Sequence, residues 1–470
     1  MRLKTVYIGM VLLFAFAKMS LAQTNTNLET DPFVLSFEEY LGYVKQHHPL
    51  IKQAELVLST GEANLLKARG GFDPKVEVDY DRKKFKGTEY YDQLNTTFKI
   101  PTWYGIELKG NFEENTGEFL DPSLTVPEDG LYSAGVSFAL AQGLLINERM
   151  ATLKKAKFFE RQTKADRDLL VNNLIYDASL AYFDWLEAQN ERIIYETFLE
   201  NASTRLEAVR RSVEEGDKAA IDITEARITA QTRKLGLEAA LLKAQKARLA
   251  VSNFLWLDGI PLEIQENINP EKPDLSVLDV SLLLVGITDT AVLLNNHPKL
   301  NSLDAKIDGL EVDRFLKKNK LLPKVDLQYN FLTPDGDQLS TFNTANYKAF
   351  LDVSFPLFLR KERGDLKLAK IKVQDAEYER TATTLAIKNK LEATEAEISS
   401  LAVQNQLIVD IVLDYQTMVQ AEERKFFLGE SSLFLINSRE QKLIDSQLKA
   451  NTLIIKELTA KANLYNAAGL

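Results

Sequence analysis

The side chains best suited to chemistry in this 470-residue chain are three histidines, His47, His48 and His297. Two histidines can bind a metal through their imidazole nitrogens. Adjacent residues on a helix point in different directions, however, and no pair of carboxylates accompanies His47 and His48. His48 and His297 directly precede prolines, Pro49 and Pro298. We therefore predict that these two histidines form helix ends and not a metal site.

The rest of the sequence lacks the residue patterns of a catalytic centre. The chain has no cysteine, which excludes thiol chemistry, disulfides and a cysteine-linked lipid anchor. It also has no glycine-rich phosphate loop and no Walker pattern. The sequence therefore predicts no enzyme, no cofactor and no resident metal. Any energy for its work must come from a partner.

The chain repeats itself. His48-Pro49 is followed by Pro74-Lys75-Val76, and His297-Pro298 is followed at the same spacing by Pro323-Lys324-Val325. The two copies lie 249 residues apart at these prolines, 217 apart at the matching Val-Ser-Phe triplets that begin at Val136 and Val353, and 213 apart at Gly216 and Gly429. An internal duplication predicts two similar structural units. The drop of 32 residues within the strand region predicts one extra hairpin in the first copy.

Residues 1–22 are typical of a signal peptide. Arg2 and Lys4 precede a short apolar core at residues 6–17, and Ser20-Leu21-Ala22 supplies small residues for cleavage. Removing the three basic residues of this segment leaves 54 basic and 67 acidic residues, a net charge of −13. This acidic balance argues against nucleic acid as a partner. The later chain has no run of 18 apolar residues, so we expect no membrane helix.

Two very long helices dominate the predicted secondary structure. Residues 148–213 contain no proline or glycine, and residues 361–428 contain one glycine, near their start. Such helices would each extend about 100 Å at 1.5 Å per residue. Each ends at a glycine, Gly216 or Gly429, and we expect a tight reversal there because glycine accepts backbone angles that other residues avoid. A short helix is expected at 36–46, opened by a capping box between Ser36 and Glu39, and another at 282–295. Helices at 49–68 and 298–320 are expected to lie end to end with the returning helices.

Strands are predicted between these helices. Residues 324–332 and 348–355 alternate between apolar and polar side chains, and four similar runs occupy about 74–141. Such alternation over about 9–11 residues is typical of a transmembrane barrel, although a soluble sheet with one wet face alternates in the same way. Acidic residues would line the polar face: Glu77, Asp79, Asp81, Glu107, Asp326 and Asp352, against Lys99 and Lys109. Trp103 and Tyr104 would suit an aromatic girdle at the membrane interface.

The order of these elements resembles that of the TolC-like outer membrane efflux protein family over almost the whole mature chain. The segment from Phe426 to Leu433, Phe-Phe-Leu-Gly-Glu-Ser-Ser-Leu, looks like the turn of the family's second hairpin. In the segment from Val213 to Ala220, Val213 replaces the aromatic residue of the first turn. The strand-to-helix passage Phe355-Pro356-Leu357-Phe358 is also similar. The resemblance implies long antiparallel helical hairpins that form a periplasmic tunnel, with strands pooled into a shared β-barrel.

The resemblance divides the chain into four parts. They are a signal peptide at 1–22, a first repeat at 23–257 with strands at about 74–141 and a helical hairpin at about 144–255, a linker at 258–280, and a second repeat at 281–470 with strands at about 323–357 and a hairpin at about 361–466. It further implies a homotrimer in the lipid of the outer membrane. Family members usually contribute four strands per chain, and twelve per trimer. Six strands are predicted here, so the extra hairpin either widens the barrel or lies outside it.

The resemblance also assigns roles to residues at the two turns. It implies that a periplasmic adaptor protein contacts Gly216, Asp217, Gly429, Glu430, Ser431 and Ser432. In some family members, acidic residues six and nine positions after the second glycine line the entrance; here Leu435 and Ser438 occupy those positions. Asp222 and Glu225 stand at the same offsets in the first repeat. They would form a ring of charge at the entrance, or they are surface charges, or they pair with Arg424 or Arg439.

The expected function is an outer membrane channel of a tripartite efflux or type I secretion system. It would be a passive duct from the periplasm to the exterior, driven by an inner-membrane pump. The alternative is a periplasmic coiled-coil protein with a structural or adhesive role that is not inserted in a membrane. Substrate identity does not follow from the sequence.

Overall fold

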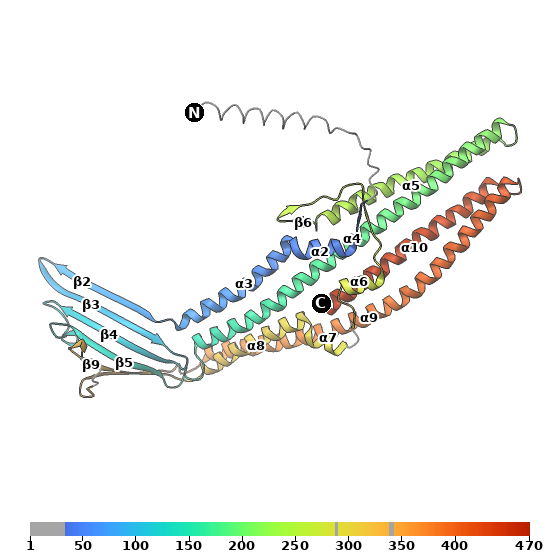
Figure 1. The fold of residues 1–470 in the computed structure, drawn as a ribbon. Helices are drawn as coiled ribbons and strands as arrows, with labels where there is room; N and C mark the ends of the chain where they lie inside the picture. The colour runs from blue at the N-terminus through green and yellow to red at the C-terminus, as the bar shows by residue number, and fades with distance from the viewer. Residues whose placement is uncertain (1–32, 287–289, 338–342) are drawn as a thin grey trace, which may run out of the picture.

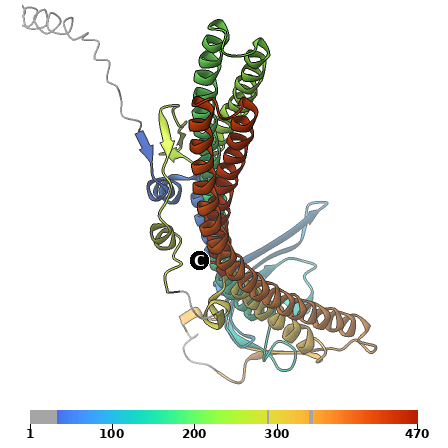
Figure 2. The same ribbon diagram turned by 90° about the vertical axis from the view of Figure 1, so that its right-hand side faces the viewer.

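The computed structural model describes residues 33–286, 290–337 and 343–470. The predicted signal peptide, residues 1–22, lies outside these ranges. The molecule is elongated: a β-sheet occupies one end, two helical hairpins reach the other end, and a small mixed region lies between them (Figure 1). The view in Figure 2 looks toward the hairpin ends and shows the two hairpins side by side.

Long helices build the rod of the molecule. α4 (Glu148–Glu214) and α9 (Arg360–Phe427) contain 67 and 68 residues. They turn back as α5 (Ala220–Ser252) and α10 (Leu433–Ala468). Nearer the sheet, α3 (Pro49–Arg69) packs on α4, and α8 (Pro298–Asn319) packs on α9 (Figure 1). The shorter helices therefore complete the length of the long ones, as predicted.

The two repeats are joined along α4, which contacts both α8 and α10 of the second repeat. Small clusters of buried apolar residues follow one another along the rod. One of them joins Phe198 of α4 to Val419 of α9 and Ile444 of α10. Alternating large and small side chains permit this close helix packing, which stabilises helices far too long to depend on a single core.

A mixed region surrounds the middle of the rod. α2 (Phe37–His47) begins with the predicted capping box between Ser36 and Glu39. Phe37 stacks on Phe183 of α4 with ring centroids 5.2 Å apart, inside the largest apolar core of the chain. The remaining elements here are β1 (Phe33–Leu35), which pairs in parallel with β8 (Ile268–Pro270), the β6 (Trp256–Leu257) and β7 (Ile260–Pro261) pair, α6 (Leu275–Ser281) and α7 (Thr290–Asn296).

One predicted helix is interrupted. In the expected helix over residues 282–295, the described residues 282–286 are not helical, and helix is found only from the start of α7 at Thr290. Leu283 and Gly286 have positive φ angles of 56° and 83°, which are incompatible with a right-handed helix. Leu282 is fully buried in the central core. Burying this leucine therefore outweighs the local helical preference of the segment.

Six strands form one antiparallel sheet in the part of the chain that the structure describes. The sheet has the order β10-β9-β5-β4-β3-β2. Short 3₁₀ turns, η1 (Gly70–Phe72) and η2 (Pro122–Leu124), lie beside it. The strands are β2 (Lys75–Phe85), β3 (Thr88–Pro101), β4 (Ile106–Thr116), β5 (Leu131–Ala139), β9 (Lys324–Thr333) and β10 (Tyr347–Ser354). The hairpin formed by β3 and β4 is the insertion of the first repeat, and it lies inside the sheet between β2 and β5.

Trp103 lies where the sheet meets the helices. It lies in the turn between β3 and β4 and stacks on Phe72, with ring centroids 5.5 Å apart. Its ring also packs against the cluster of Ile146 and Met150. Tyr104 remains exposed. This turn faces the helix ends that lie directly beneath it, and a place for Trp103 and Tyr104 in an aromatic girdle at the membrane interface stays a prediction.

One described helix, α9, contains a stretch long and apolar enough to cross a membrane by length and composition. Its apolar residues include Leu401 and Ile408, which pack in a cluster with Leu453 of α10. Figure 1 shows α9 running along the rod to the hairpin end. Only 11% of this stretch is buried within the single chain.

Candidate functional site: a polar sheet face and two glycine turns

All six strands present one apolar face and one polar face. The register aligns Val76, Phe98, Gly110, Ala134 and Phe331 in one row across the sheet. Neighbouring rows on the same face hold Val, Leu, Tyr and Phe side chains from every strand. The opposite face is mainly polar, and its apolar exceptions include Tyr91, Leu131, Leu332 and Phe350. This continuity is favoured in a wall that separates an apolar medium from water.

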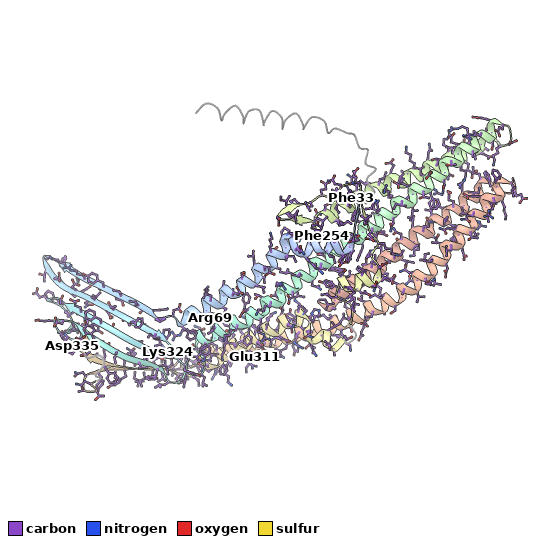
Figure 3. The ribbon with its side chains drawn as sticks, viewed as in Figure 1. Phe33, Arg69, Phe254, Glu311, Lys324 and Asp335 are labelled. Atoms are coloured by element: carbon purple, nitrogen blue, oxygen red, sulfur yellow. The ribbon has the colours of Figure 1, made fainter. Side chains whose placement is uncertain are left out.

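The predicted acidic residues all lie on the polar face. They are Glu77, Asp79, Asp81, Glu107, Asp326 and Asp352. Lys99 and Lys109 lie on the same face, so basic side chains offset part of this acidity. Figure 3 labels Lys324 where the strands meet the helices and Asp335 at the far end of the sheet. The polar face therefore leads away from the helical rod.

Several of these charges are paired. Lys99 contacts Glu77, Arg149 Nη2 lies 2.6 Å from Glu107 Oε1, and Lys324 Nζ lies 3.0 Å from Asp326 Oδ2. Asp79 and Asp352 take part in none of the ion pairs formed within the described ranges. Most of these groups are partly exposed, so each pair contributes little to stability. Their main effect is to make this face wettable.

The two glycine turns share one geometry. Gly216 has φ +87° and Gly429 has φ +78°. The amide of Gly216 donates to Val213 O at 3.1 Å, and the next amide, of Asp217, donates to Ser212 O at 2.8 Å. The second turn has the same two bonds, from Gly429 to Phe426 O (3.1 Å) and from Glu430 to Lys425 O (2.8 Å). Both turns are therefore Schellman motifs, which end a helix with glycine in a left-handed conformation.

The residues predicted to contact a partner lie together around these turns. Gly216, Asp217, Gly429, Glu430 and Ser432 are exposed, and Ser431 is half-buried. The Ser431 hydroxyl hydrogen-bonds the Glu422 carboxylate, and Ser432 Oγ accepts from Leu435 N at 3.3 Å as the N-cap of α10. The exposed groups are free for contact with another protein, whereas Ser431 has a local bond that holds the turn.

The two candidate ring residues differ in their surroundings. Glu225 is half-buried and accepts a hydrogen bond from Asn437 Nδ2 of α10 at 3.3 Å. Asp222 lies in the first turn of α5, also half-buried. Neither carboxylate pairs with Arg424 or Arg439 in the described structure. Glu225 therefore faces the second hairpin, and its role in an entrance ring stays a prediction.

A buried ion cluster that no sequence pattern predicted joins all four helices near the turns. Glu440 of α10 has a side chain only 1% exposed. Its Oε1 lies 3.0 Å from Arg205 Nη2 of α4, and its Oε2 lies 3.4 Å from Arg233 Nη2 of α5. Arg205 also pairs with Glu423 of α9 at 3.1 Å. We call these four residues the Glu440 cluster. No local sequence signal marks it, because its members lie far apart in the chain.

The turns themselves are held together by apolar contacts. Leu433 and Phe426 pack with Val209 and Ala226 across the two hairpins. Lys218 Nζ lies 3.6 Å from the centroid of the Phe426 ring, a favourable cation–π geometry. Phe427, the next residue, is 90% exposed. An aromatic side chain this exposed is a strong candidate for a partner contact.

Two of the histidines form helix ends, as predicted. His48 Nδ1 accepts from Leu50 N at 3.1 Å, and His297 Nδ1 accepts from Lys299 N at 3.1 Å. Each is therefore the N-cap of a helix whose first residue is proline. Burial lowers the pKa of both imidazoles, because it disfavours their charged form. Within the described ranges, no group of three or more His, Asp or Glu side chains could hold a metal ion.

The known proteins to which this chain is similar are outer membrane efflux proteins and channels. The family model described as "Outer membrane efflux protein" matches residues 291–470. A probable efflux pump outer membrane protein of Pseudomonas putida, TtgC, is 22% identical over 309 residues, or 63% of this chain. The match spans 60% of the length of that relative.

Two solved structures have the same fold along most of the chain. The outer membrane channel CmeC of Campylobacter jejuni superposes with a TM-score of 0.65 at 13% identity, covering 92% of this chain and 85% of that one. The open state of the outer membrane channel MtrE of Neisseria gonorrhoeae gives 0.66 at 13% identity, covering 92% and 88%. At these identities the likeness shows the fold.

Proposed function

We propose that the chain is a member of the TolC-like outer membrane efflux protein family and that it is the outer membrane channel of a tripartite efflux or type I secretion system. It is a passive duct from periplasm to exterior and performs no catalysis. The observation that carries this proposal is the continuous separation of apolar and polar side chains on six paired strands at one end of a long helical rod. Lipid meets the apolar face, and water and solute meet the polar face.

The free edges of the sheet support a shared barrel. In the described chain, β2 pairs only with β3, and β10 pairs only with β9. Exposed edges with free amides and carbonyls cannot persist in a membrane, because hydrocarbon offers them no hydrogen bonds. A homotrimer closes them, and its helical rods form the tunnel in the periplasm.

The glycine turns lie at the opposite end of the rod from the sheet (Figure 1). In this proposal they are the periplasmic entrance. A periplasmic adaptor contacts the exposed residues of the turns, and an inner-membrane pump supplies the energy. Asp222 and Glu225 add negative charge at this entrance, which raises the local concentration of cations.

The experiment is to fractionate cells that produce the full-length protein. A channel is expected in the outer membrane fraction, as a detergent-extracted trimer that forms ion-conducting pores in a planar bilayer. Release of all the protein without detergent would instead favour a periplasmic coiled-coil protein. Loss of export from a strain that lacks the gene, restored by the wild-type gene, tests the transport role separately.

A further inference from the structure

The two edge strands of the sheet, β2 and β10, restrict how two copies of the chain can join. The six strands alternate in direction, so β2 runs opposite to β10. β2 of one copy can therefore extend the sheet from β10 of another as one more antiparallel strand. All eleven residues of β2 are exposed, as are most residues of β10. Both edges are thus available to a second copy of this chain.

The apolar face restricts the register between the two edges. Val76, Val78 and Tyr80 of β2 lie on the apolar face, as do Ala349 and Leu351 of β10. A slip of one residue would turn every side chain of a strand to the wrong face. The registers that keep the apolar side chains of both strands on one face therefore differ from one another by multiples of two residues.

Charges on the polar face select one of these registers. When Lys75 lies opposite Asp352, Asp79 lies opposite Lys348, and both pairs combine opposite charges. A slip of two residues in one direction places Glu77 opposite Asp352. The same slip in the other direction places Asp73 there. Like charges directly opposite each other destabilise a sheet, so the first register is favoured.

The charge of Lys324 in the same chain reaches Asp352, but Lys324 forms its ion pair with Asp326. The partner of Asp352 across the sheet is Asp326 of β9, another acid. Lys324 pairs with Asp326 at 3.0 Å, but Asp352 has no ion pair in the described chain, and neither does Lys75. Lys348 lies 3.6 Å from Glu113 and is 63% exposed, so it remains open to a further acid. A neighbouring β2 would supply Lys75 to Asp352 and Asp79 to Lys348.

The inserted hairpin is part of the sheet. β3 pairs with β4 over ten residues, and these strands pair with β2 and β5 on either side. Its turn is anchored on the helices: Trp103 stacks on Phe72, and Asn147 Nδ2 donates to Trp103 O at 3.2 Å. The hairpin therefore occupies the same wall as the other strands.

Resting on the homotrimer proposed above, we propose that β2 of each copy pairs with β10 of the next copy in the register that sets Lys75 opposite Asp352 and Asp79 opposite Lys348. All six strands of each copy then enter one barrel of eighteen strands. Barrel diameter grows roughly linearly with strand number, so this barrel is about one and a half times as wide as one of twelve strands. Such a barrel is wide enough for an aqueous channel.

Disulfide trapping tests the register, because the chain has no cysteine of its own. Val78→Cys combined with Ala349→Cys places two thiols directly opposite each other between copies. Oxidation of outer membranes is expected to convert most chains to covalent dimers and trimers on a non-reducing gel. Each single variant, and Val78→Cys with Val353→Cys, should remain largely monomeric. Efficient coupling of the shifted pair, or no coupling in an intact trimer, overturns the register.

A second pair of variants tests the strand number. Leu108→Cys with Val136→Cys joins β4 to β5 within one chain, in the pairing described above. Val78 and Tyr132 lie in one row of the sheet. Val78→Cys with Tyr132→Cys would join β2 directly to β5, which is possible only if the hairpin lies outside the barrel. Peptide mapping is expected to show the first disulfide and not the second. The reverse result would overturn the eighteen-stranded barrel but leave the proposed channel function intact.

Charge exchange tests the polar pair. Lys75→Glu should at least halve the fraction of trimer that survives warming in SDS, and Lys75→Glu with Asp352→Lys should restore it. Lys83 lies on the same strand but beyond the end of β10 in this register, so Lys83→Glu should not change the fraction of surviving trimer. Equal loss in Lys75→Glu and Lys83→Glu, or no rescue, overturns the pairing. Absence of any trimer in the wild-type protein would instead contradict the proposed function.

Discussion

At the residue scale, Glu440 is a charged residue of the described structure whose side chain is only 1% exposed. It joins Arg205, Arg233 and, through Arg205, Glu423, and so links four helices. The side chain of Arg233 is 5% exposed. Burying its charge costs free energy that a neighbouring acid must offset. The cluster therefore holds the two hairpins in one relative position near the turns.

Replacing Glu440 tests this link. Glu440→Gln keeps the shape of the side chain but leaves Arg233 without its anion, and we expect a loss of about 3–5 kcal/mol in the free energy of unfolding. Chemical denaturation of the detergent-solubilised protein, followed by circular dichroism, measures it. Glu423→Gln is the matched control, because Glu423 is 46% exposed and an exposed pair contributes at most about 1 kcal/mol. Equal effects of the two variants would contradict a structural role for the buried cluster.

The two capping histidines predict a dependence of stability on pH. Each accepts an amide hydrogen on Nδ1, which requires the neutral imidazole. Because burial lowers their pKa in the folded protein below the usual value of about 6.5, the unfolded chain binds more protons just below that pH. Stability should therefore decrease as the pH falls below about 6.5, and level off below the folded-state pKa.

Thermal unfolding at pH 7.5 and 5.5 checks this sign. His48→Asn with His297→Asn keeps a good N-cap acceptor that does not titrate, so the variant should lose less stability between these two pH values than the wild type. His47→Asn is the control, because His47 caps no helix, and it should behave as the wild type. A double variant with the wild-type pH dependence would show that other groups are responsible.

At the element scale, each hairpin depends on one left-handed residue at its turn. A side chain added at Gly216 or Gly429 would meet no atom within 4 Å. The positive φ angle is thus the reason for glycine at both positions. The hairpins differ in sequence but end in the same pair of hydrogen bonds, which is the clearest structural trace of the duplication.

Alanine in place of either glycine should destabilise the turn. Gly216→Ala or Gly429→Ala costs roughly 1–2 kcal/mol because the left-handed conformation is unfavourable with a Cβ atom. Amide hydrogens in the last helical turn should then exchange about tenfold faster for each 1.4 kcal/mol, as measured by hydrogen exchange and mass spectrometry. Gly309→Ala in α8 is the matched control: it also meets open space but lies in a regular helix, where alanine is favoured. Slower exchange in Gly309→Ala together with faster exchange at the turns would support the prediction.

Most elements could be predicted from the sequence, because their signals are local. Periodicity and the absence of proline marked α4 and α9 to within a residue or two, and alternation marked the strands. The helix expected at 282–295 was wrong because the burial of Leu282 is a tertiary effect. Whether the β3–β4 hairpin belongs to the sheet also depended on long-range pairing. The Glu440 cluster was missed for the same reason, since Arg205 and Glu440 are 235 residues apart.

At the scale of the whole molecule, several apolar residues at the turns lie outside the folded core. They are available for assembly with a partner. Phe427 contributes nothing to the internal core, being 90% exposed, and Phe434 and Leu428 nearby are also largely exposed. An exposed cluster of this kind at the end of a rod is favoured only when a partner covers it. In the proposed function that partner is the periplasmic adaptor.

Phe427→Ser should weaken that contact and leave the channel intact. A central aromatic residue in an interface often contributes 2 kcal/mol or more, so we expect recovery of the adaptor with the purified channel to fall by tenfold or more. Trimer formation should not change. Ile260→Ser, an equally polar substitution at an exposed apolar residue in the middle of the rod, is the control. Normal adaptor recovery with Phe427→Ser would place the contact elsewhere.

The position of the inserted hairpin has a consequence for how such a wall can evolve. β3 and β4 enter between β2 and β5, so the two outermost strands of the sheet are the same with or without them. A hairpin always adds two strands, which preserves the opposite directions of β2 and β10. Natural selection could therefore alter the calibre of the pore by gain or loss of a hairpin while the recognition between copies is inherited unchanged.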